Sequence, residues 1–498
     1  MSEETRVPEE EAQSLSEILQ IRRDKLAKLQ EEGKDPFHVT KFTRTAYSTE
    51  VKENFDRMEG QTASMAGRMM SKRVMGKAFF ADILDDKGRI QLYIKVDSLG
   101  EALFNEFRKW DIGDIIGVSG EVFRTKRGEI SIHVRSVQLL SKSLLPLPEK
   151  FHGLTNQELR YRQRYVDLIM NPEVRRTFEI RTKVIQTIRR FLDERGYLEV
   201  ETPVLNTVSG GATARPFVTH HNTLDLEMFM RIATELHLKR LVVGGIERVY
   251  EIGRLFRNEG MSPRHNPEFT TVEFYEAYAD YHDMMDRTEG IFVKAAEEIL
   301  GTTEISYQGQ PVSLAAPFAR LTMAEAVKQY TGLDFMAMPD AKEAAKAARD
   351  IGIELPKELT WGNILFECFD QRVEAKLIQP TFILDHPVEV SPLAKRCPAD
   401  PRLTERFELF ITGREMANAF SELNDPIDQK ARFQSQMDLR AAGDEEASMM
   451  DEDFITALEY GLPPTGGCGI GIDRMVMLLT DSPSIRDVIL FPTMKPTE

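Results

Sequence analysis

Residues 256–278 read FRNEGMSPRHNPEFTTVEFYEAY, and this stretch decides the fold of the larger part of the chain. A polar, Gly- and Pro-containing loop at 259–267 separates two segments with strand-like patterning. The pattern predicts an antiparallel pair of strands over 248–258 and 268–278.

Because side chains alternate along a strand, charged and aromatic residues of these two strands share one face. Arg257 and Glu259 share a face near the loop, and Phe269, Glu273 and Tyr275 share a face of the returning strand. Taken singly, an Arg–Glu pair is more often a surface ion pair, and a lone phenylalanine is more often a core residue.

Two further segments have the same mixture of strand, helix and glycine. RGYLEVETPVL, residues 195–205, predicts a helix end followed by a short strand that stops at Pro203. GGCGIGIDRMVMLL, residues 466–479, has glycines at every second position and then a helix that Arg474 opens. Glycine inside a strand is unfavourable and often marks a close approach of backbone to a ligand. Tight strand–helix packing is the simpler alternative.

The order and content of these three segments resemble the signature motifs of class II aminoacyl-tRNA synthetases. HNPEFTTVEFYEAYADYHD, GREMANAFSELNDP, EYGLPPTGG and IRDVILFP are similar to the bacterial type of lysyl-tRNA synthetase, and so is GRMMSKRVMGKAFF near the N-terminus. The resemblance covers about residues 10–495. It implies an α+β chain in which a five-stranded OB barrel precedes an antiparallel catalytic sheet flanked by helices. The implied activity is ATP-dependent formation of lysyl-adenylate, followed by transfer of lysine to the 3′ end of tRNA(Lys).

The resemblance also implies how ATP is held. Adenylate formation needs cations on the phosphates and a slot for the base. Arg257 and Arg474 are the implied catalytic residues, on the α- and γ-phosphates, and Phe269 is expected to stack on adenine. The full set of implied ATP-binding residues is Arg257, Glu259, His265, Asn266, Phe269, Glu408, Glu415 and Arg474.

Lysine recognition requires anionic groups for two ammonium groups and a cation for the carboxylate. The resemblance assigns the α-amine to Glu235 and the Gly211 carbonyl, and the ε-amine to Glu273, Tyr275 and Glu422. Asn418, Phe420 and Gly469 complete the implied lysine site. Asn418, Phe420 and Glu422 share strand parity but Glu415 does not, so a bulge or twist is expected between 415 and 418.

A metal site is suggested by the hairpin in RFELFITGREMANAFSEL, residues 406–423, which turns near Thr412 and Gly413. If the turn is centred between Ile411 and Thr412, Glu408 and Glu415 lie directly opposite each other. Like charges across a strand pair are destabilising, and a bridging Mg²⁺ would reverse that effect. A turn displaced by one residue would spoil this pairing. The resemblance assigns Mg²⁺ to the same two glutamates.

Five short strands with a helix after the third are predicted between residues 62 and 140, which is the order of an OB barrel. Residues 60–145 carry 14 Lys or Arg against 10 Asp or Glu, in a chain whose formal net charge is −16. By resemblance, Arg68, Phe80 and Gln91 read the tRNA anticodon, with the aromatic ring stacking on a base.

The expected domains are an N-terminal helix and lead-in (1–59), the OB barrel (60–145), a linker (146–172) and the catalytic domain (173–498) with a helical insertion near 322–376. A helix is expected over 9–32, with Arg22, Arg23, Lys25 and Lys28 along its exposed side. Those four residues form either a solvated helix face or a contact for a tRNA arm.

The composition predicts a cytoplasmic protein. The acidic N-terminus lacks the apolar core of a signal peptide, no apolar run is long enough to span a membrane, and three cysteines are too few for a disulfide framework. Pro203 and the helix before it resemble the dimer motif of the family, so a homodimer is expected.

Three alternatives to a lysine–tRNA ligase remain. An aspartyl- or asparaginyl-type enzyme shares the barrel and the motifs, but its pocket needs cations or amides where Glu273 and Glu422 stand. A ligase that transfers lysine to a protein would lack the N-terminal barrel. A tRNA-binding protein without catalysis would have lost catalytic residues, all of which are present here.

Overall fold

The computed structural model describes residues 9–148, 154, 156–355, 359–443 and 446–497. The chain divides into two compact units, Met1–Gly153 and Leu154–Glu498, and each has its own hydrophobic core.

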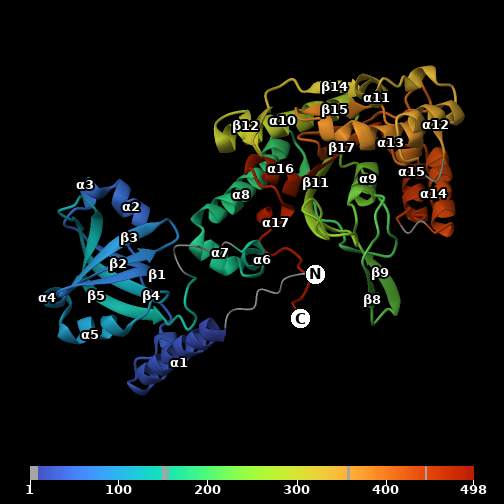
Figure 1. The fold of residues 1–498 in the computed structure, drawn as a ribbon. Helices are drawn as coiled ribbons and strands as arrows, with labels where there is room; N and C mark the ends of the chain where they lie inside the picture. Colours follow the sequence, from blue (N-terminus) through green and yellow to red (C-terminus); the bar gives the residue numbers. More distant parts are fainter. Residues whose placement is uncertain (1–8, 149–153, 155, 356–358, 444–445, 498) are drawn as a thin grey trace. The chain divides into compact units, whose positions relative to one another are not determined.

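The first unit is built around a closed five-stranded barrel (Figure 1). Its strands are β1 (Thr62–Met75), β2 (Ala78–Leu84), β3 (Arg89–Lys95), β4 (Ile115–Arg124) and β5 (Ile130–Ser141), in the order β1-β2-β3-β5-β4. Two helices, α4 (Val96–Leu99) and α5 (Glu101–Lys109), come after β3. The predicted order of five strands with a helix after the third is confirmed.

Apolar side chains at alternate positions of each strand fill the interior of this barrel. Phe79 and Ala81 of β2 point into the core, and Phe104 and Phe107 of α5 close it with ring centroids 4.8 and 5.3 Å from that of Phe79. The residues between them on β2, Phe80 among them, therefore lie on the outer face.

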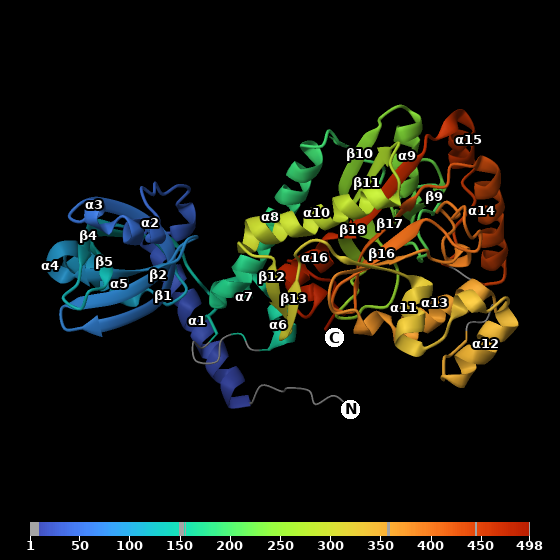
Figure 2. The same ribbon diagram turned by 90° about the horizontal axis from the view of Figure 1, so that it is seen from above.

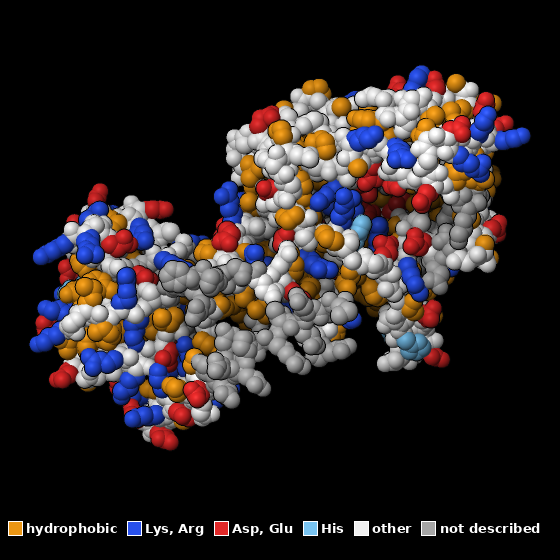
Figure 3. All heavy atoms as spheres, in the orientation of Figure 1, with side chains coloured by type: hydrophobic (Ala, Val, Ile, Leu, Met, Phe, Trp, Pro, Cys, Tyr) orange, Lys and Arg blue, Asp and Glu red, His pale blue; other side chains and the backbone are white. Residues whose placement is uncertain are grey.

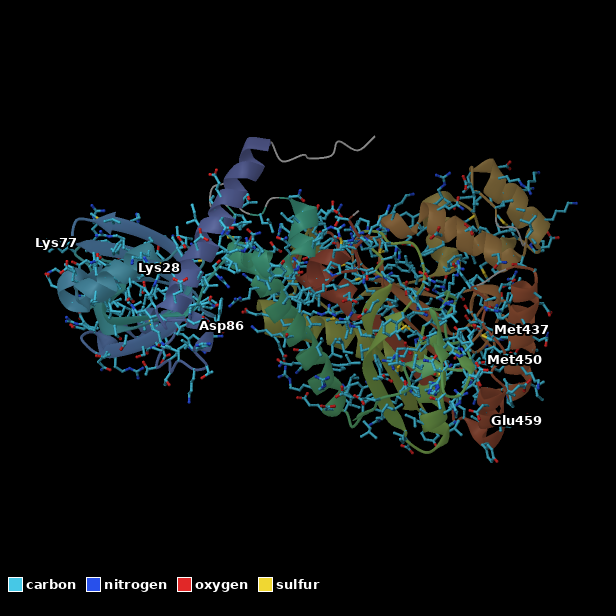
Figure 4. All side chains as sticks on the ribbon, turned by 90° about the horizontal axis from the view of Figure 1, so that it is seen from below. Lys28, Lys77, Asp86, Met437, Met450 and Glu459 are labelled. Carbon is cyan, nitrogen blue, oxygen red and sulfur yellow. The ribbon has the colours of Figure 1, made fainter. Side chains whose placement is uncertain are left out.

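The N-terminal helix α1 (Glu9–Glu31) matches the predicted range, but one of its basic residues was misplaced. Arg22 is buried rather than on the exposed side, because its guanidinium donates to the carbonyl oxygens of Ser143, Leu145 and Ile112. Lys25 pairs with Asp111 at 2.6 Å. Lys28 remains exposed on the helix (Figure 4).

The second unit is built on an eight-stranded sheet in the order β14-β15-β16-β17-β18-β11-β10-β6. Its strands are β6 (Leu198–Glu199), β10 (Arg248–Phe256), β11 (Glu268–Ala277), β14 (Ala319–Thr322), β15 (Thr381–Leu384), β16 (Arg406–Phe410), β17 (Glu415–Ser421) and β18 (Thr465–Gly471). β10 and β11 pair antiparallel from Arg248↔Glu276 to Phe256↔Glu268, which confirms the predicted hairpin.

Three helices cover one face of this sheet: α8 (Pro172–Asp193), α10 (Tyr281–Leu300) and α16 (Ile472–Leu479) (Figure 2). Their apolar residues share a core with Val272 and Phe274 of β11 and with Ala417 and Ala419 of β17. Because side chains alternate, the intervening residues of β11, β17 and β18 face the other way, where no helix of this group fills the space.

Smaller elements surround the sheet. Two small sheets are formed by β7 (Leu205–Asn206), β8 (Val218–His221) and β9 (Leu226–Met230), and by β12 (Glu304–Tyr307) and β13 (Gln310–Ser313). The first unit also contains α2 (Ser48–Glu53) and α3 (Phe55–Met58), and the remaining α-helices of the second unit are α6 (Gln157–Arg162), α7 (Arg164–Met170), α9 (Glu235–Val243), α11 (Met323–Thr331), α12 (Ala341–Asp350), α13 (Trp361–Arg372), α14 (Pro426–Ala441), α15 (Glu452–Gly461) and α17 (Ile485–Val488). Helices α11, α12 and α13 bury a separate apolar cluster.

Candidate active site

A cavity of about 380 Å³ opens on the sheet face that α8, α10 and α16 leave free. Every residue of the catalytic, ATP-binding, lysine-binding and metal sets predicted from the sequence lines it. They come from segments as far apart in the sequence as Gly211 and Arg474, and the sheet brings them together. In Figure 3, acidic and basic side chains gather around a hollow in this unit.

Glycines of β18 form part of the cavity wall. Gly467 pairs with Tyr275 and with Phe420, and a Cβ atom at Gly467 would overlap the side chains of Glu422 and Tyr275. At Gly469 a Cβ atom would lie 3.5 Å from the side chain of Glu273. The alternate glycines therefore leave room for the large side chains of the neighbouring strands, whereas the sequence pattern suggested room for a ligand.

One end of the cavity is acidic and buried. Glu273 and Tyr275 of β11 and Glu422, just past β17, are 8%, 3% and 1% exposed, and Glu235 at the start of α9 is 7% exposed. Phe420 lies on the same face of β17 as Glu422, and Gly211 lies against Ala233 and Glu235.

Sequence reasoning missed one charged residue at this acidic end. Lys239, one turn after Glu235 on α9, is completely buried, and its ammonium lies 2.5 Å from Glu235 Oε1 and in contact with Glu422 Oε2. The i, i+4 spacing of Glu235 and Lys239 on a helix is a signal that could have indicated the pair.

Burial controls the ionisation of these carboxyl groups. It raises the pKa of Glu273 to about 7, and the nearby Glu235 raises it further in the same direction. Burial also raises the pKa of Glu422 well above its usual value, and Lys239 partly offsets that effect. The Tyr275 hydroxyl is kept neutral, because burial and the surrounding glutamates raise its pKa.

The other end of the cavity carries the cations. The Arg257 guanidinium lies 5.2 Å from the centroid of the Phe269 ring, and its Nε has no hydrogen-bond partner among the described residues. Arg474 Nη1 donates to the backbone oxygen of Glu415 at 2.6 Å and to its Oε2 at 3.2 Å. An arginine nitrogen that is buried and unpaired favours an anionic ligand at this place.

The loop between β10 and β11 supplies the remaining polar groups. Asn266 is buried and donates to the Glu268 carbonyl, whereas Glu259 and His265 are exposed at the rim. Partial desolvation within the cavity and the nearby Arg474 lower the pKa of His265 below its usual value.

A buried network holds Arg474 and Phe269 in place. Asp473 accepts from Arg181 Nη1 at 2.5 Å and from the backbone N–H of Thr270 at 2.6 Å. The start of α16, the second strand of the hairpin and α8 are thereby joined directly beside the cation-rich end.

The predicted pairing of Glu408 with Glu415 is wrong. The turn is centred between Thr412 and Gly413, both with positive φ, so Glu415 lies opposite Phe410 and Glu408 lies opposite Asn418. The expected bulge between 415 and 418 is confirmed: Leu409 pairs with Ala417 and Phe410 with Glu415, which leaves Met416 unpaired.

The bulge nevertheless brings both glutamates to the cavity face. Glu408 and Phe410 are two residues apart on β16 and share a face, and Glu415 is the partner of Phe410, so the two carboxylates are diagonal neighbours. Burial raises the pKa of Glu408 to about 7 despite its 2.6 Å contact with Arg406, and Glu415 adds to the rise.

The partner carboxylate behaves in the opposite way. Burial alone would raise the pKa of Glu415, but Arg474 and Arg257 lower it below its usual value. Glu374 also acts on both groups from beside the hairpin, and sequence reasoning did not point to it. Among the described residues there is no cluster of three or more His, Cys, Asp or Glu side chains arranged to hold a metal.

The barrel carries its predicted residues on its outer face. Phe80 pairs with Tyr93 across β2 and β3, with ring centroids 5.0 Å apart, and Gln91 accepts from Ser131 on β5. Arg68 donates to the Gly113 carbonyl at 2.8 Å. Arg73, which sequence reasoning passed over, is exposed and lies directly opposite Phe80.

Aromatic rings continue across this face. Tyr93, Phe123 and His133 have centroids 5.3–5.9 Å from one another, and all three are partly exposed. Lys77 is exposed at the turn between β1 and β2 (Figure 4). Aromatic faces beside exposed cations are typical of surfaces that bind single-stranded nucleic acid.

Comparison with known proteins assigns the chain to a family. Residues 156–495 match the family described as tRNA synthetases class II (D, K and N), and residues 63–140 match the OB-fold nucleic acid binding domain. The chain therefore belongs to the class II tRNA synthetases of the D, K and N group, which are aminoacyl-tRNA synthetases.

Similar curated proteins share one activity in their names. The chain is 59% identical to the lysine–tRNA ligase of Moorella thermoacetica, over 97% of this chain and 99% of that protein. It is 58% identical to the lysine–tRNA ligase of Thermoanaerobacter sp. (strain X514), over 97% of each chain. It is 57% identical to that of Carboxydothermus hydrogenoformans, over 98% of this chain and 100% of that protein.

Proposed function

We propose that this protein is a lysine–tRNA ligase, which activates L-lysine with ATP and transfers it to tRNA(Lys). The acidic, buried end of the cavity carries the proposal: Glu273 and Glu422 with Tyr275 suit an ammonium group, which is tolerable in a buried place only with charge-assisted partners. The family includes enzymes for aspartate and asparagine, and a side-chain carboxylate would be repelled by these glutamates.

Each end of the cavity then has a role. Glu273, Tyr275 and Glu422 hold the ε-ammonium of lysine, and Phe420 packs on its methylene stem. Glu235 and the Gly211 carbonyl hold the α-ammonium, while Asn418 and Arg257 bind the carboxylate and Gly469 leaves room for the backbone of the substrate. The cavity separates the two ammonium groups from the cations that bind phosphate, which prevents the two substrates from exchanging places.

The cation-rich end binds ATP. Arg257 neutralises charge on the α-phosphate as the lysine carboxylate attacks it and the bond to the β-phosphate breaks, and Arg474 holds the γ-phosphate of the departing pyrophosphate. Phe269 stacks on adenine, with Glu259, His265 and Asn266 along the nucleotide. Catalysis here is positioning and charge stabilisation, so no side chain has to form a covalent bond.

Glu408 and Glu415 are the residues that would hold Mg²⁺. Two like-charged carboxylates on one face, one with a raised pKa, fit a site that binds a divalent cation together with substrate phosphates. Bound there, the ion would neutralise charge on the ATP phosphates. Arg406 and Arg474 hold the two carboxylates in place at 2.6 and 3.2 Å.

The barrel binds the anticodon of tRNA. Phe80 stacks on an unpaired base, Gln91 reads a base edge, and Arg68 and the exposed Arg73 contribute positive charge. The ring surface formed with Tyr93 supports this role.

The active form is a homodimer. Around Pro203 the chain exposes a series of apolar residues, among them Leu198 at 53%, Leu205 at 43% and Val218 at 56%. An exposed apolar patch of this kind marks an interface. Mass measurement at micromolar protein should give twice the 56.9 kDa of the chain, and an active monomer would contradict this. The protein acts in the cytoplasm, and no helix of the described part of the chain could cross a membrane.

The direct test is amino-acid-dependent pyrophosphate exchange with all twenty standard amino acids. Lysine alone should support rapid exchange. Ornithine, one methylene shorter, should lose more than the about 1–3 kcal/mol of packing that a methylene contributes, because its ammonium falls short of the glutamates. Activation of aspartate or asparagine would overturn the proposal.

A further inference from the structure

Lys239 occupies an unusual place for a lysine. It is 0% exposed, and its ammonium lies between Glu235 Oε1 and Glu422 Oε2. Phe420 and Phe454 present their rings to it, with centroids 5.4 and 5.9 Å from Nζ. The side chain does not line the cavity, so it lies behind the wall formed by the two glutamates.

The charges at this end of the cavity can be counted. Three carboxyl groups, Glu235, Glu273 and Glu422, are each less than 9% exposed, and Lys239 is the cation in contact with two of them. With all four ionised, the group carries two negative charges. Lysine brings two ammonium groups to this end, and its carboxylate pairs with Arg257, so the bound site is then neutral.

We propose that Lys239 is a positioning residue that sets the substrate specificity of this pocket. Its ammonium fixes Glu235 and Glu422 and reduces three carboxylates to the charge that an amino acid with two ammonium groups neutralises. The proposal rests on the proposed activity toward lysine and adds the residue that adjusts the pocket to it.

The geometry of Glu422 supports this role. Both carboxylate oxygens are buried and neither makes a hydrogen bond with the described residues. Oε2 contacts the Lys239 ammonium as an ion pair, and Oε1 approaches Gly467 in the cavity wall. Holding one oxygen with an internal ammonium aims the other at the place of an external one. Glu235 Oε1 likewise accepts a hydrogen bond from the Lys239 ammonium.

Removal of the Lys239 ammonium would leave like charges facing one another. Glu235 from α9, Glu273 from β11 and Glu422 would lack a counter-charge, beside the neutral Tyr275 and Cys468 and with Arg257 farther along the cavity. Like charges in a buried place favour protonation, so at least one glutamate would bind a proton and stop accepting from lysine.

The test compares Lys239→Met with Val242→Ala. Methionine keeps the length of the stem and removes the charge. Val242, on the same helix and 2% exposed, packs in an apolar cluster with Leu238 and Phe454 and carries no charge, so it controls for loss of packing. Lys239→Gln is a second neutral variant that keeps a hydrogen-bond donor, in case methionine prevents folding.

Lys239→Met should raise KM for lysine in pyrophosphate exchange by about tenfold or more, which is about 1.4 kcal/mol, and leave KM for ATP within about twofold. The acidic limb of its pH profile for lysine kcat/KM should move to higher pH by about one pH unit. Lys239→Arg, which keeps the charge, should recover part of the lysine affinity. Val242→Ala should lower Tm and leave KM for lysine and the pH profile unchanged.

Several outcomes overturn the assignment. A neutral variant that folds and keeps the wild-type KM and pH profile would show that the ammonium does not position the glutamates. Failure of both neutral variants to fold, while Val242→Ala folds, would make Lys239 a residue of the fold alone. Absence of lysine-dependent exchange in the wild type would instead overturn the proposed function.

Discussion

The barrel and the cavity are expected to recognise their ligands by opposite means. The barrel presents partly exposed rings and cations on an open outer face, where each contact is screened by water. The cavity presents carboxylates and an internal ammonium that are almost completely buried. Buried charges act strongly and depend on one another, whereas exposed contacts add up in smaller and more independent amounts.

The largest effect is expected where Glu408 and Glu415 are proposed to share one Mg²⁺. Glu408→Gln or Glu415→Gln should abolish Mg²⁺-dependent adenylate formation, because an amide cannot replace a carboxylate ligand. Pyrophosphate exchange across a Mg²⁺ titration measures this, with circular dichroism to verify the fold. Glu405→Gln, one residue before β16 and outside the cavity lining, is the matched control. Normal exchange in either variant would place the ion elsewhere.

The next effect concerns a single charge at the acidic end. Glu422→Gln should lower kcat/KM for lysine by at least about 100-fold, the loss of one strong ionic hydrogen bond. KM for ATP should not change, since Glu422 lies at the opposite end from Arg474. Kinetics of pyrophosphate exchange at varied lysine concentration would measure both constants. An unimpaired variant would show that the buried carboxylate contributes no more to recognition than an exposed contact on the barrel.

A smaller effect is expected on the barrel. Phe80→Ala should weaken tRNA binding by about 1–3 kcal/mol through lost stacking, and should leave lysyl-adenylate formation unchanged. Filter binding of tRNA and pyrophosphate exchange measure the two separately. Phe37→Ala, 50% exposed in the same unit, is the control. Equal losses in charging and exchange would mean that Phe80 serves stability.

The smallest effect is one of pH. Burial raises the pKa of Glu273 to about 7. Only the ionised carboxylate carries the negative charge that attracts the ammonium group of lysine, because the protonated carboxyl group is neutral. Lysine binding should therefore weaken as pH falls through about 7, by about threefold from about pH 7.5 to about pH 6.5 for one titrating group. Lysine kcat/KM measured against pH, and its loss of dependence in Glu273→Gln, would check this. Binding of tRNA to the barrel should not show the same pH dependence.

Much of the fold could be predicted because its signals are local. The period-two alternation in 256–278 and the glycines of 466–471 are enough to indicate strands and the face that each residue takes. Phe269, Glu273 and Tyr275 lie together on the cavity side of β11 as this alternation predicts.

The misses have physical causes that lie outside any single segment. The pairing of Glu408 depended on a turn that is centred one residue later than assumed, and turn position shifts every partner in a hairpin. Arg22 belongs to a helix face that the barrel covers, so its burial is decided by the carbonyl groups of Ser143 and Leu145, which are 121 and 123 residues away in the sequence.

Lys239 shows a different limit. A lysine in a helix is usually read as exposed, because burying an ammonium is costly unless it is paired. Its two partners are Glu235, four residues away, and Glu422, which only the sheet brings near. A sequence pattern can indicate the first partner, and only the tertiary structure supplies the second.

The bulge at Met416 places both ends of β17 on the cavity side of the sheet. Because of it, Glu415 at one end and Glu422 at the other both face the cavity, so β17 with its next residue spans the distance between the phosphate end and the ammonium end. At about 3.3 Å per residue, these seven steps cover on the order of 20 Å, and this length has to hold the proposed lysine and the phosphates of the proposed ATP together. Adding two residues between Phe420 and Glu422 would keep Asn418, Phe420 and Glu422 on the cavity face while moving Glu422 about 7 Å farther from Glu415. The proposed lysine would then no longer reach Glu422, although every side chain of the proposed pocket would still be present.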